Sequence, residues 1–182
     1  MKTTRFITVL IFVMIVLTGC ETTSSIPYSA STQNVLNFQK QLPETNVSLG
    51  SFVDSNHMEE LTCRLLGPID VSRGKSKAEY IKDAMQTELF LAQVYSVDSD
   101  VIIEGKLDAV NFSSVSPANW EFEFTVSSNL YTGYTVKTKY EFNTSYSAYS
   151  ACKNVADAFG PAVQDLINTI VTHPDFSKLV EK

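Results

Sequence analysis

A short basic loop is the first place where the sequence could bind a charged ligand. Arg73, Gly74, Lys75 and Ser76 precede a segment with helical periodicity, and Gly-Lys-Ser also occurs in the phosphate-binding loop of nucleotide-binding proteins. That motif needs a glycine where Ile69 stands, so a nucleotide site is excluded. Free N–H groups at a helix start can still bind an anion, so we expect weak anion binding here, with a solvated loop as the alternative.

The two histidines and the paired carboxylates do not form a catalytic or metal site. His57 lies among acidic residues in a predicted turn and His173 precedes a proline, whereas zinc sites need three or four convergent ligands. Glu121 and Glu123 alternate onto an exposed strand face, whereas a general acid needs surroundings that shift its pKa. We therefore expect no metal, no cofactor and no enzymatic activity.

The N-terminus carries the features of an exported, lipid-modified protein. A twelve-residue apolar run at 6–17 follows two positive charges; it is too short to span a membrane and fits the core of a signal peptide. The run ends in Leu17-Thr18-Gly19-Cys20, which resembles the lipobox of bacterial lipoproteins. The resemblance implies that 1–19 is removed, that Cys20 carries diacylglycerol, and that its new amine is acylated. The alternative is an ordinary secretory signal with an incidental cysteine.

Lipidation would place the mature chain on the periplasmic face of a membrane. In the sorting rule of enteric-type bacteria, Asp after the lipidated cysteine retains the protein in the inner membrane. Glu21 stands there, so we expect the outer membrane. Removal of Lys2 and Arg5 takes the net charge from −6 to −8, and an acidic body is not attracted to anionic lipid. Attachment is therefore expected to come from the acyl chains.

Two further cysteines, Cys63 and Cys152, remain in the mature chain. In an oxidising compartment such a pair predicts a disulfide. Two buried free thiols are the alternative, and a catalytic thiol with His57 or His173 as its partner is a third, weaker one.

Composition restricts the class of protein and its partners. A chain of 182 residues suggests one domain. Asp plus Glu (20) exceed Lys plus Arg (14), which excludes a nucleic-acid partner, since binding to phosphate needs a basic surface. The polar segment 20–45 is predicted to be a tether, within which 33–42 could form a short helix, and 46–182 a single α+β periplasmic domain.

Hydrophobic periodicity predicts the order β-β-α-β-β-β-α in this domain. Period-two alternation marks strands, and apolar spacings of three and four mark helices. Ser76 and Glu79 have the spacing of a capping box, and Gly160-Pro161 predicts a kink or two abutting helices. The predicted strands are 46–53, 61–66, 101–113, 120–127 and 135–145, and the main helices are 76–95 and 152–170. We expect an antiparallel sheet of four to five strands with two helices on one face.

The last two strands also predict their own register. Residues that pair must lie on the same face, and the apolar residues of both strands have even numbers. Pairing Glu123 with Lys137 and Glu121 with Lys139 places opposite charges across the strands. The numbers of paired residues should then sum to 260.

Taken together, the pattern resembles small periplasmic lipoproteins of the YajG type. The stretches 63–69, 74–76 and 151–152 are also similar to stretches of uncharacterised lipoproteins. These families have no assigned catalysis. The resemblance implies a non-enzymatic module that binds an envelope protein or supports envelope assembly. A carrier of a small or lipidic ligand, with a pocket between helices and sheet, is the alternative.

Overall fold

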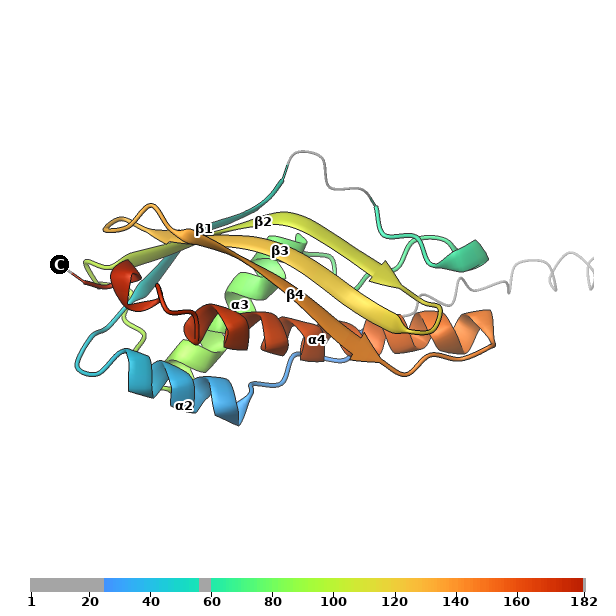
Figure 1. The fold of residues 1–182 in the computed structure, drawn as a ribbon, viewed down its shortest axis with the longest axis horizontal. Coiled ribbons are helices and arrows are strands. Elements are labelled where there is room, and N and C mark those ends of the chain that lie inside the picture. Colours follow the sequence, from blue (N-terminus) through green and yellow to red (C-terminus); the bar gives the residue numbers. More distant parts are fainter. Residues whose placement is uncertain (1–24, 56–59, 182) are drawn as a thin grey trace, which may run out of the picture.

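A computed structural model of the chain describes residues 25–55 and 60–181. The helices α2, α3 and α4 lie on one face of a single sheet (Figure 1). The predicted α+β class is confirmed, with three helices in place of two. Within the described residues, no helix is long and apolar enough to cross a membrane. The elements are α2 (Thr32–Gln41), β1 (Ser48–Asp54), η1 (Arg64–Leu66), α3 (Lys77–Leu91), β2 (Ile102–Ser113), β3 (Ala118–Ser128), β4 (Tyr134–Phe142), α4 (Ala148–Val171) and η2 (Ser177–Leu179).

The sheet is mixed, whereas the sequence predicted an antiparallel one. Its strand order is β1-β2-β3-β4, and β1 runs parallel to β2 while the other pairs are antiparallel. Parallel neighbours need a crossover connection, which here contains α3. The prediction failed because the strand expected at 61–66, which would have preceded that helix, does not form.

Segment 61–66 forms a tight loop in place of this strand. Thr62 makes an isolated bridge with Pro68, and the 3-10 helix η1 lies between them. Arg64 has a φ of +50°, which reverses the chain within a few residues. Leu65 and Leu66 are exposed, so the apolar run that suggested a buried strand does not contribute its leucines to the core.

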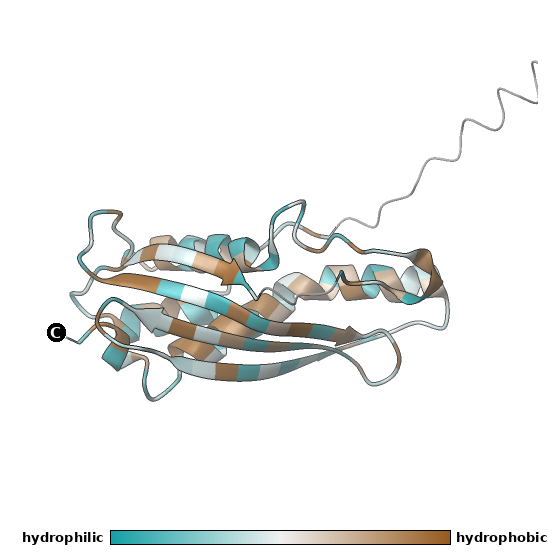
Figure 2. Cartoon of the chain, turned by 90° about the horizontal axis from the view of Figure 1, so that it is seen from above, coloured by the Kyte–Doolittle hydropathy of each residue, from teal (hydrophilic) through white to brown (hydrophobic). Residues whose placement is uncertain are grey.

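The hairpin of β3 and β4 has the predicted register. Glu121 pairs with Lys139 and Glu123 with Lys137, so the numbers of paired residues sum to 260. Both pairs form ion pairs, at 3.0 and 2.9 Å. Hydrophilic and hydrophobic residues alternate along the strands (Figure 2), as period-two alternation requires of a sheet with one covered face.

A bulge in β2 changes which of its residues face the core. The register with β3 shifts between Leu107 and Ala109, so Val110 is buried and Ala109 is not. Strict alternation along 101–113 would place Ala109 on the same face as Ile103 and Leu107. An extra residue in one strand is not visible in a period-two pattern.

Aromatic side chains fill the space between the sheet and α4. Trp120 and Phe159 are fully buried, with ring centroids 5.0 Å apart. The indole N–H of Trp120 donates to the carbonyl of Val155 at 2.9 Å, so this buried polar group has its partner. Phe122 contacts the same phenylalanine, at 5.9 Å between centroids.

The helix α3 has the predicted start but ends earlier than expected. Ser76 and Glu79 form the capping box. At the other end, Gln93 has a φ of +62°, and the N–H groups of Gln93 and Val94 donate to the carbonyls of Phe90 and Leu89. These bonds form a Schellman motif, which ends the helix at Leu91 without a glycine.

The predicted boundary at residue 46 is wrong for the described part of the tether. The segment 25–45 contains α2, and Phe38 and Leu42 are fully buried. Asn34 is also buried and donates to the carbonyl of Gln164 in α4 at 2.9 Å. The folded body therefore includes the residues from Ser25 onward. The short helix expected at 33–42 is present as α2. Polar composition concealed its packing against the body, because it contributes only a few apolar side chains to the core.

The C-terminal helix α4 is continuous from Ala148 to Val171 with Pro161 inside it. Gly160-Pro161 predicted either a kink or two abutting helices. The prediction of two separate helices is therefore wrong. Ser147 caps the helix by accepting from the N–H of Ser150.

Candidate binding groove

The outer edge of β2 is paired along only half of its length. The pairing of β1 with β2 ends at Asp54 and Leu107, and the Ser55 N–H donates to the Leu107 carbonyl at 2.9 Å. Within residues 25–55 and 60–181, no strand continues this pairing along 108–113. An unpaired strand edge presents backbone donors and acceptors that can pair with another extended chain.

A groove of about 720 Å³ lies along this open edge. Residues 108–115 of β2 and the following turn form one wall, and segment 60–64 forms the other. Its lining is mostly polar and includes Glu60, Thr62, Asn111 and Ser113. The groove is therefore suited to a polar, extended chain better than to an apolar small molecule.

Two charged side chains at the groove are held by the fold. Arg64 donates to the carbonyls of Ser114 and Ser145 at 2.8 and 3.2 Å. Asp108 lies at the bulge, where burial raises the pKa of its carboxyl, but hydrogen bonds from Lys106 and Thr125 lower that pKa below its usual value. Asp108 therefore stays ionised at neutral pH and is not a proton donor there.

The predicted disulfide joins Cys63 to Cys152, with their Cα atoms 5.8 Å apart. Of the three alternatives for these cysteines, the structure shows this one. Both residues are fully buried. The bond attaches the loop that contains η1 to the first turns of α4, and so fixes the wall of the groove that segment 60–64 provides.

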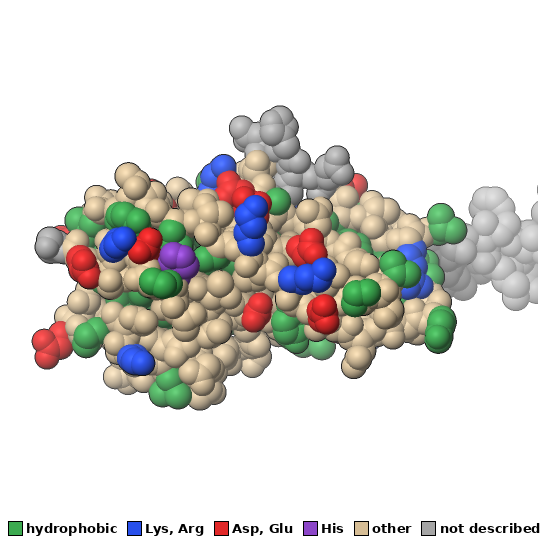
Figure 3. All heavy atoms as spheres, in the orientation of Figure 1, with side chains coloured by type: hydrophobic (Ala, Val, Ile, Leu, Met, Phe, Trp, Pro, Cys, Tyr) green, Lys and Arg blue, Asp and Glu red, His purple; other side chains and the backbone are tan. Residues whose placement is uncertain are grey.

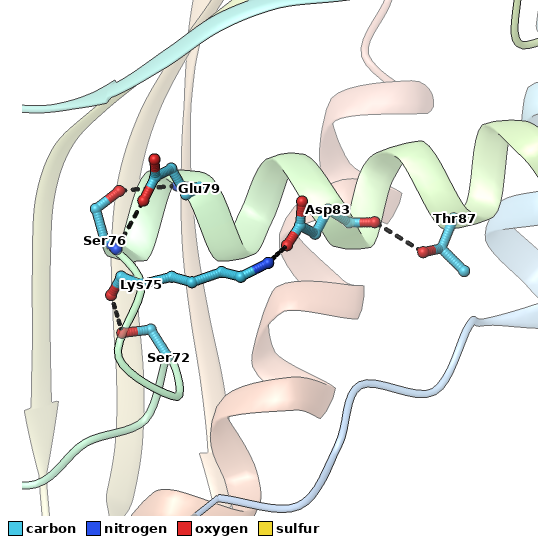
Figure 4. A network of polar contacts seen from close by, with 6 residues as sticks. All are labelled: Ser72, Lys75, Ser76, Glu79, Asp83 and Thr87. Carbon is cyan, nitrogen blue, oxygen red and sulfur yellow. Dashed lines mark hydrogen bonds and ion pairs between the residues drawn. The ribbon is translucent and has the colours of Figure 1, made fainter.

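The predicted anion loop already has carboxylate partners within the protein. The N–H groups of Lys77 and Ala78 donate to Asp54 at 3.3 and 2.8 Å, and Ser76 takes part in the capping box. Lys75 pairs with Asp83, eight residues further along the chain in α3 (Figure 4). Asp54, the last residue of β1, thus occupies the helix start where a dissolved anion would bind.

The other site residues of the sequence prediction do not meet in one place. Cys20 and His57 lie outside the described residues. His173 stacks on Tyr134 with centroids 4.1 Å apart, and its Nδ1 accepts from the N–H of Asp175. Within 25–55 and 60–181, no group of three His, Cys, Asp or Glu side chains could hold a metal ion.

Sequence reasoning missed a buried carboxylate, Glu88, on the inner face of α3. Its side chain is fully buried and accepts from the Tyr28 hydroxyl at 2.6 Å and the Ser31 N–H at 2.8 Å. Burial raises the pKa of this carboxyl, and the bond from Tyr28 opposes that rise. Burial also raises the pKa of the Tyr28 hydroxyl. The sequence offered one signal of this site: Glu88 stands among the apolar positions of α3 that face the core. Its contacts hold segment 25–31 against the body.

Comparison with known proteins supports the fold alone. No family model matches the sequence, and no curated protein matches it significantly. Among solved structures, the crystal structure of protein XCC0632 from Xanthomonas campestris, a DUF330 protein, is similar with a TM-score of 0.50 and 9% sequence identity. The alignment covers 81% of this chain and 91% of that chain.

Proposed function

We propose that this chain is a lipid-anchored lipoprotein of the bacterial envelope, attached through Cys20 to the periplasmic face of the outer membrane. Its body would be a non-enzymatic accessory module that binds an extended segment of an envelope protein. The lipobox-like sequence supports the anchor, and the resemblance to YajG-type lipoproteins supports the class of protein. The observation that carries the binding function is the unpaired edge of β2 beside the groove.

Strand addition is the binding mode that this geometry favours. In that mode an extended peptide pairs with an exposed sheet edge, so main-chain hydrogen bonds provide affinity. Among the described residues, no strand pairs with the edge at 108–113, and segment 60–64 lies across from it. The disulfide and Arg64 keep both walls in place, so the groove is formed before the partner binds. A preformed groove lowers the entropy cost of ordering its loops on binding.

The carrier alternative has less support in the packing. A ligand carrier needs a concave, mostly apolar pocket, predicted here between the helices and the sheet. Fully buried side chains, including Trp120, Phe124 and Phe159, occupy that space. We therefore retain partner binding as the proposal.

Photocrosslinking in intact cells tests this function. A photoreactive amino acid replaces Asn111, which is exposed and lines the groove. The matched control replaces Glu104, which is exposed on the same strand where β1 covers the edge. We expect the Asn111 position alone to crosslink one short segment of an envelope protein. Crosslinks to lipid or to a small molecule would support the carrier, and equal crosslinking from both positions would contradict strand addition.

A further inference from the structure

One end of the molecule consists of three loops that the fold ties together. We call this end the tip and define it as residues 63–68, 114–117 and 143–149. The Arg64 side chain donates to Ser114 in the second loop and to the carbonyls of Ser145 and Tyr146 in the third. The hydroxyl of Thr144 also donates to the Ser114 carbonyl at 2.5 Å. The disulfide at Cys63 also ties the tip to α4. The tip is therefore a fixed surface rather than three independent loops.

The tip exposes large apolar side chains. Leu65 and Tyr146 are fully exposed, at 102% and 107%, and Val115 is 65% exposed. Leu66 and Tyr149 add to them, at 52% and 45%. Figure 3 shows hydrophobic side chains at this end of the molecule. Several large apolar side chains exposed at one end of a folded protein suggest a site of interaction with a protein or a membrane.

The tip differs from the rest of the chain in its charge. Its three loops contain one charged residue, Arg64, in a chain whose residues are 19% charged and whose net charge is −6. Arg64 binds carbonyls of the tip itself. Anionic lipid repels an acidic body, but an uncharged surface with tyrosines can enter the interface between headgroups and acyl chains, where tyrosine is enriched.

The N-terminal segment shows that the tip lies on the anchor side of the body. From Ser29 to Asn37 the chain passes from Gln164 to Asn168, so it runs along α4 in the direction of that helix. Ser25 therefore lies toward the N-terminal end of α4, which belongs to the tip (Figure 1). Its hydroxyl donates to the carbonyl of Val71, which follows η1 in the chain.

The length of the chain before Ser25 limits the distance of the body from the membrane. Ser25 is the fifth residue after Cys20, so at full extension their Cα atoms are at most about 17 Å apart. The 24 residues of α4 span about 36 Å. A lipid on Cys20 would therefore hold the end of the body near the start of α4 closer to the bilayer than its far end.

We propose that the tip rests in the lipid surface, with Leu65, Val115 and Tyr146 in the interface of the leaflet that holds the anchor. This inference depends on the proposed lipidation of Cys20. It adds a second, non-covalent contact, which fixes the orientation of the body. The groove beside β2 then has a constant direction relative to the membrane.

Depth-dependent fluorescence quenching tests this orientation in the full-length, processed protein. Tyr146→Trp places a reporter at the tip, and Val97→Trp is the matched control, because Val97 is 76% exposed in the loop before β2, at the opposite end of the sheet. Each protein is reconstituted in vesicles of phosphatidylethanolamine and phosphatidylglycerol that contain brominated phosphatidylcholine. The signal of the parent chain, whose Trp120 is buried, is subtracted. We expect loss of emission for Tyr146→Trp and no loss for Val97→Trp.

Two further measurements separate the possible failures. Leu65→Glu with Val115→Glu should restore the emission of the Tyr146→Trp protein, whereas Leu36→Glu on the exposed side of α2 should not. The mass of the purified protein shows whether Cys20 carries lipid. A lipidated protein whose Tyr146→Trp reporter is not quenched would overturn the tip contact alone and favour a protein partner there. A protein without lipid mass would overturn the anchored function, and the inference with it.

Discussion

Opening the disulfide should remove a large part of the stability of the domain. Cys63 and Cys152 are 89 residues apart in sequence. By lowering the entropy of the unfolded chain, a crosslink over such a loop raises the free energy of the unfolded state by about 4–5 kcal/mol at 25 °C. Typical domains have an unfolding free energy of about 5–15 kcal/mol. Reduction should therefore remove between about a third and most of that free energy, with the loop that contains η1 released from α4.

Urea unfolding of the oxidised and the reduced protein measures this effect. Reduction keeps both sulfur atoms in the core, so the difference reports the crosslink with little change in packing. The double variant Cys63→Ala with Cys152→Ala should lose at least as much free energy, because two fully buried sulfur atoms are also removed. A difference below about 1 kcal/mol between the oxidised and reduced proteins would refute the loop-entropy argument.

Three further substitutions test other parts of the fold. Lys139→Glu places a like charge opposite Glu121 and should lower the free energy of unfolding by about 0.2–1 kcal/mol. Adding Glu121→Lys should restore most of this free energy, and a double-mutant cycle that shows no coupling would contradict a stabilising pair. The buried Glu88 holds its proton at pH values where the unfolded chain has lost it, so stability should fall as pH rises through its raised pKa; Glu88→Gln should flatten this slope in urea titrations, and an unchanged slope would assign it to another group. A Cβ on Gly105 would lie 2.5 Å from the Phe124 ring, so Gly105→Ala should lower stability by about 1–3 kcal/mol, and an unchanged thermal midpoint would show that the ring moves freely.

The sequence predicted those parts of the fold that depend on local periodicity. The hairpin register follows from the even spacing of apolar residues in 120–142 and from the positions of four charges. The capping box of α3 follows in the same way from Ser76 and Glu79. In these cases neighbours in sequence or across one turn determine the structure, so no long-range information is needed.

The failures are at places where distant residues determine the conformation. Leu65 and Leu66 read as part of a strand, but the disulfide and the left-handed Arg64 make that segment a loop. Asp54 occupies the start of α3 from the end of β1, which no spacing in the loop itself could indicate. Glu88 binds a segment 57 to 60 residues away. The groove was not foreseen, because it depends on where β1 stops beside β2.

The course of the N-terminal segment determines how the body would resist a pull on the proposed lipid anchor at Cys20. From Ser25 the chain runs away from the tip along α4, fastened at Tyr28 and Ser31 to Glu88 and at Asn34 to Gln164. A force on that anchor would act along these contacts, so they would be loaded together in shear and would not open one after another. Such tension would fall on the helical layer first. The parallel pairing of β1 with β2, which borders the groove, would be strained only after α2 had detached.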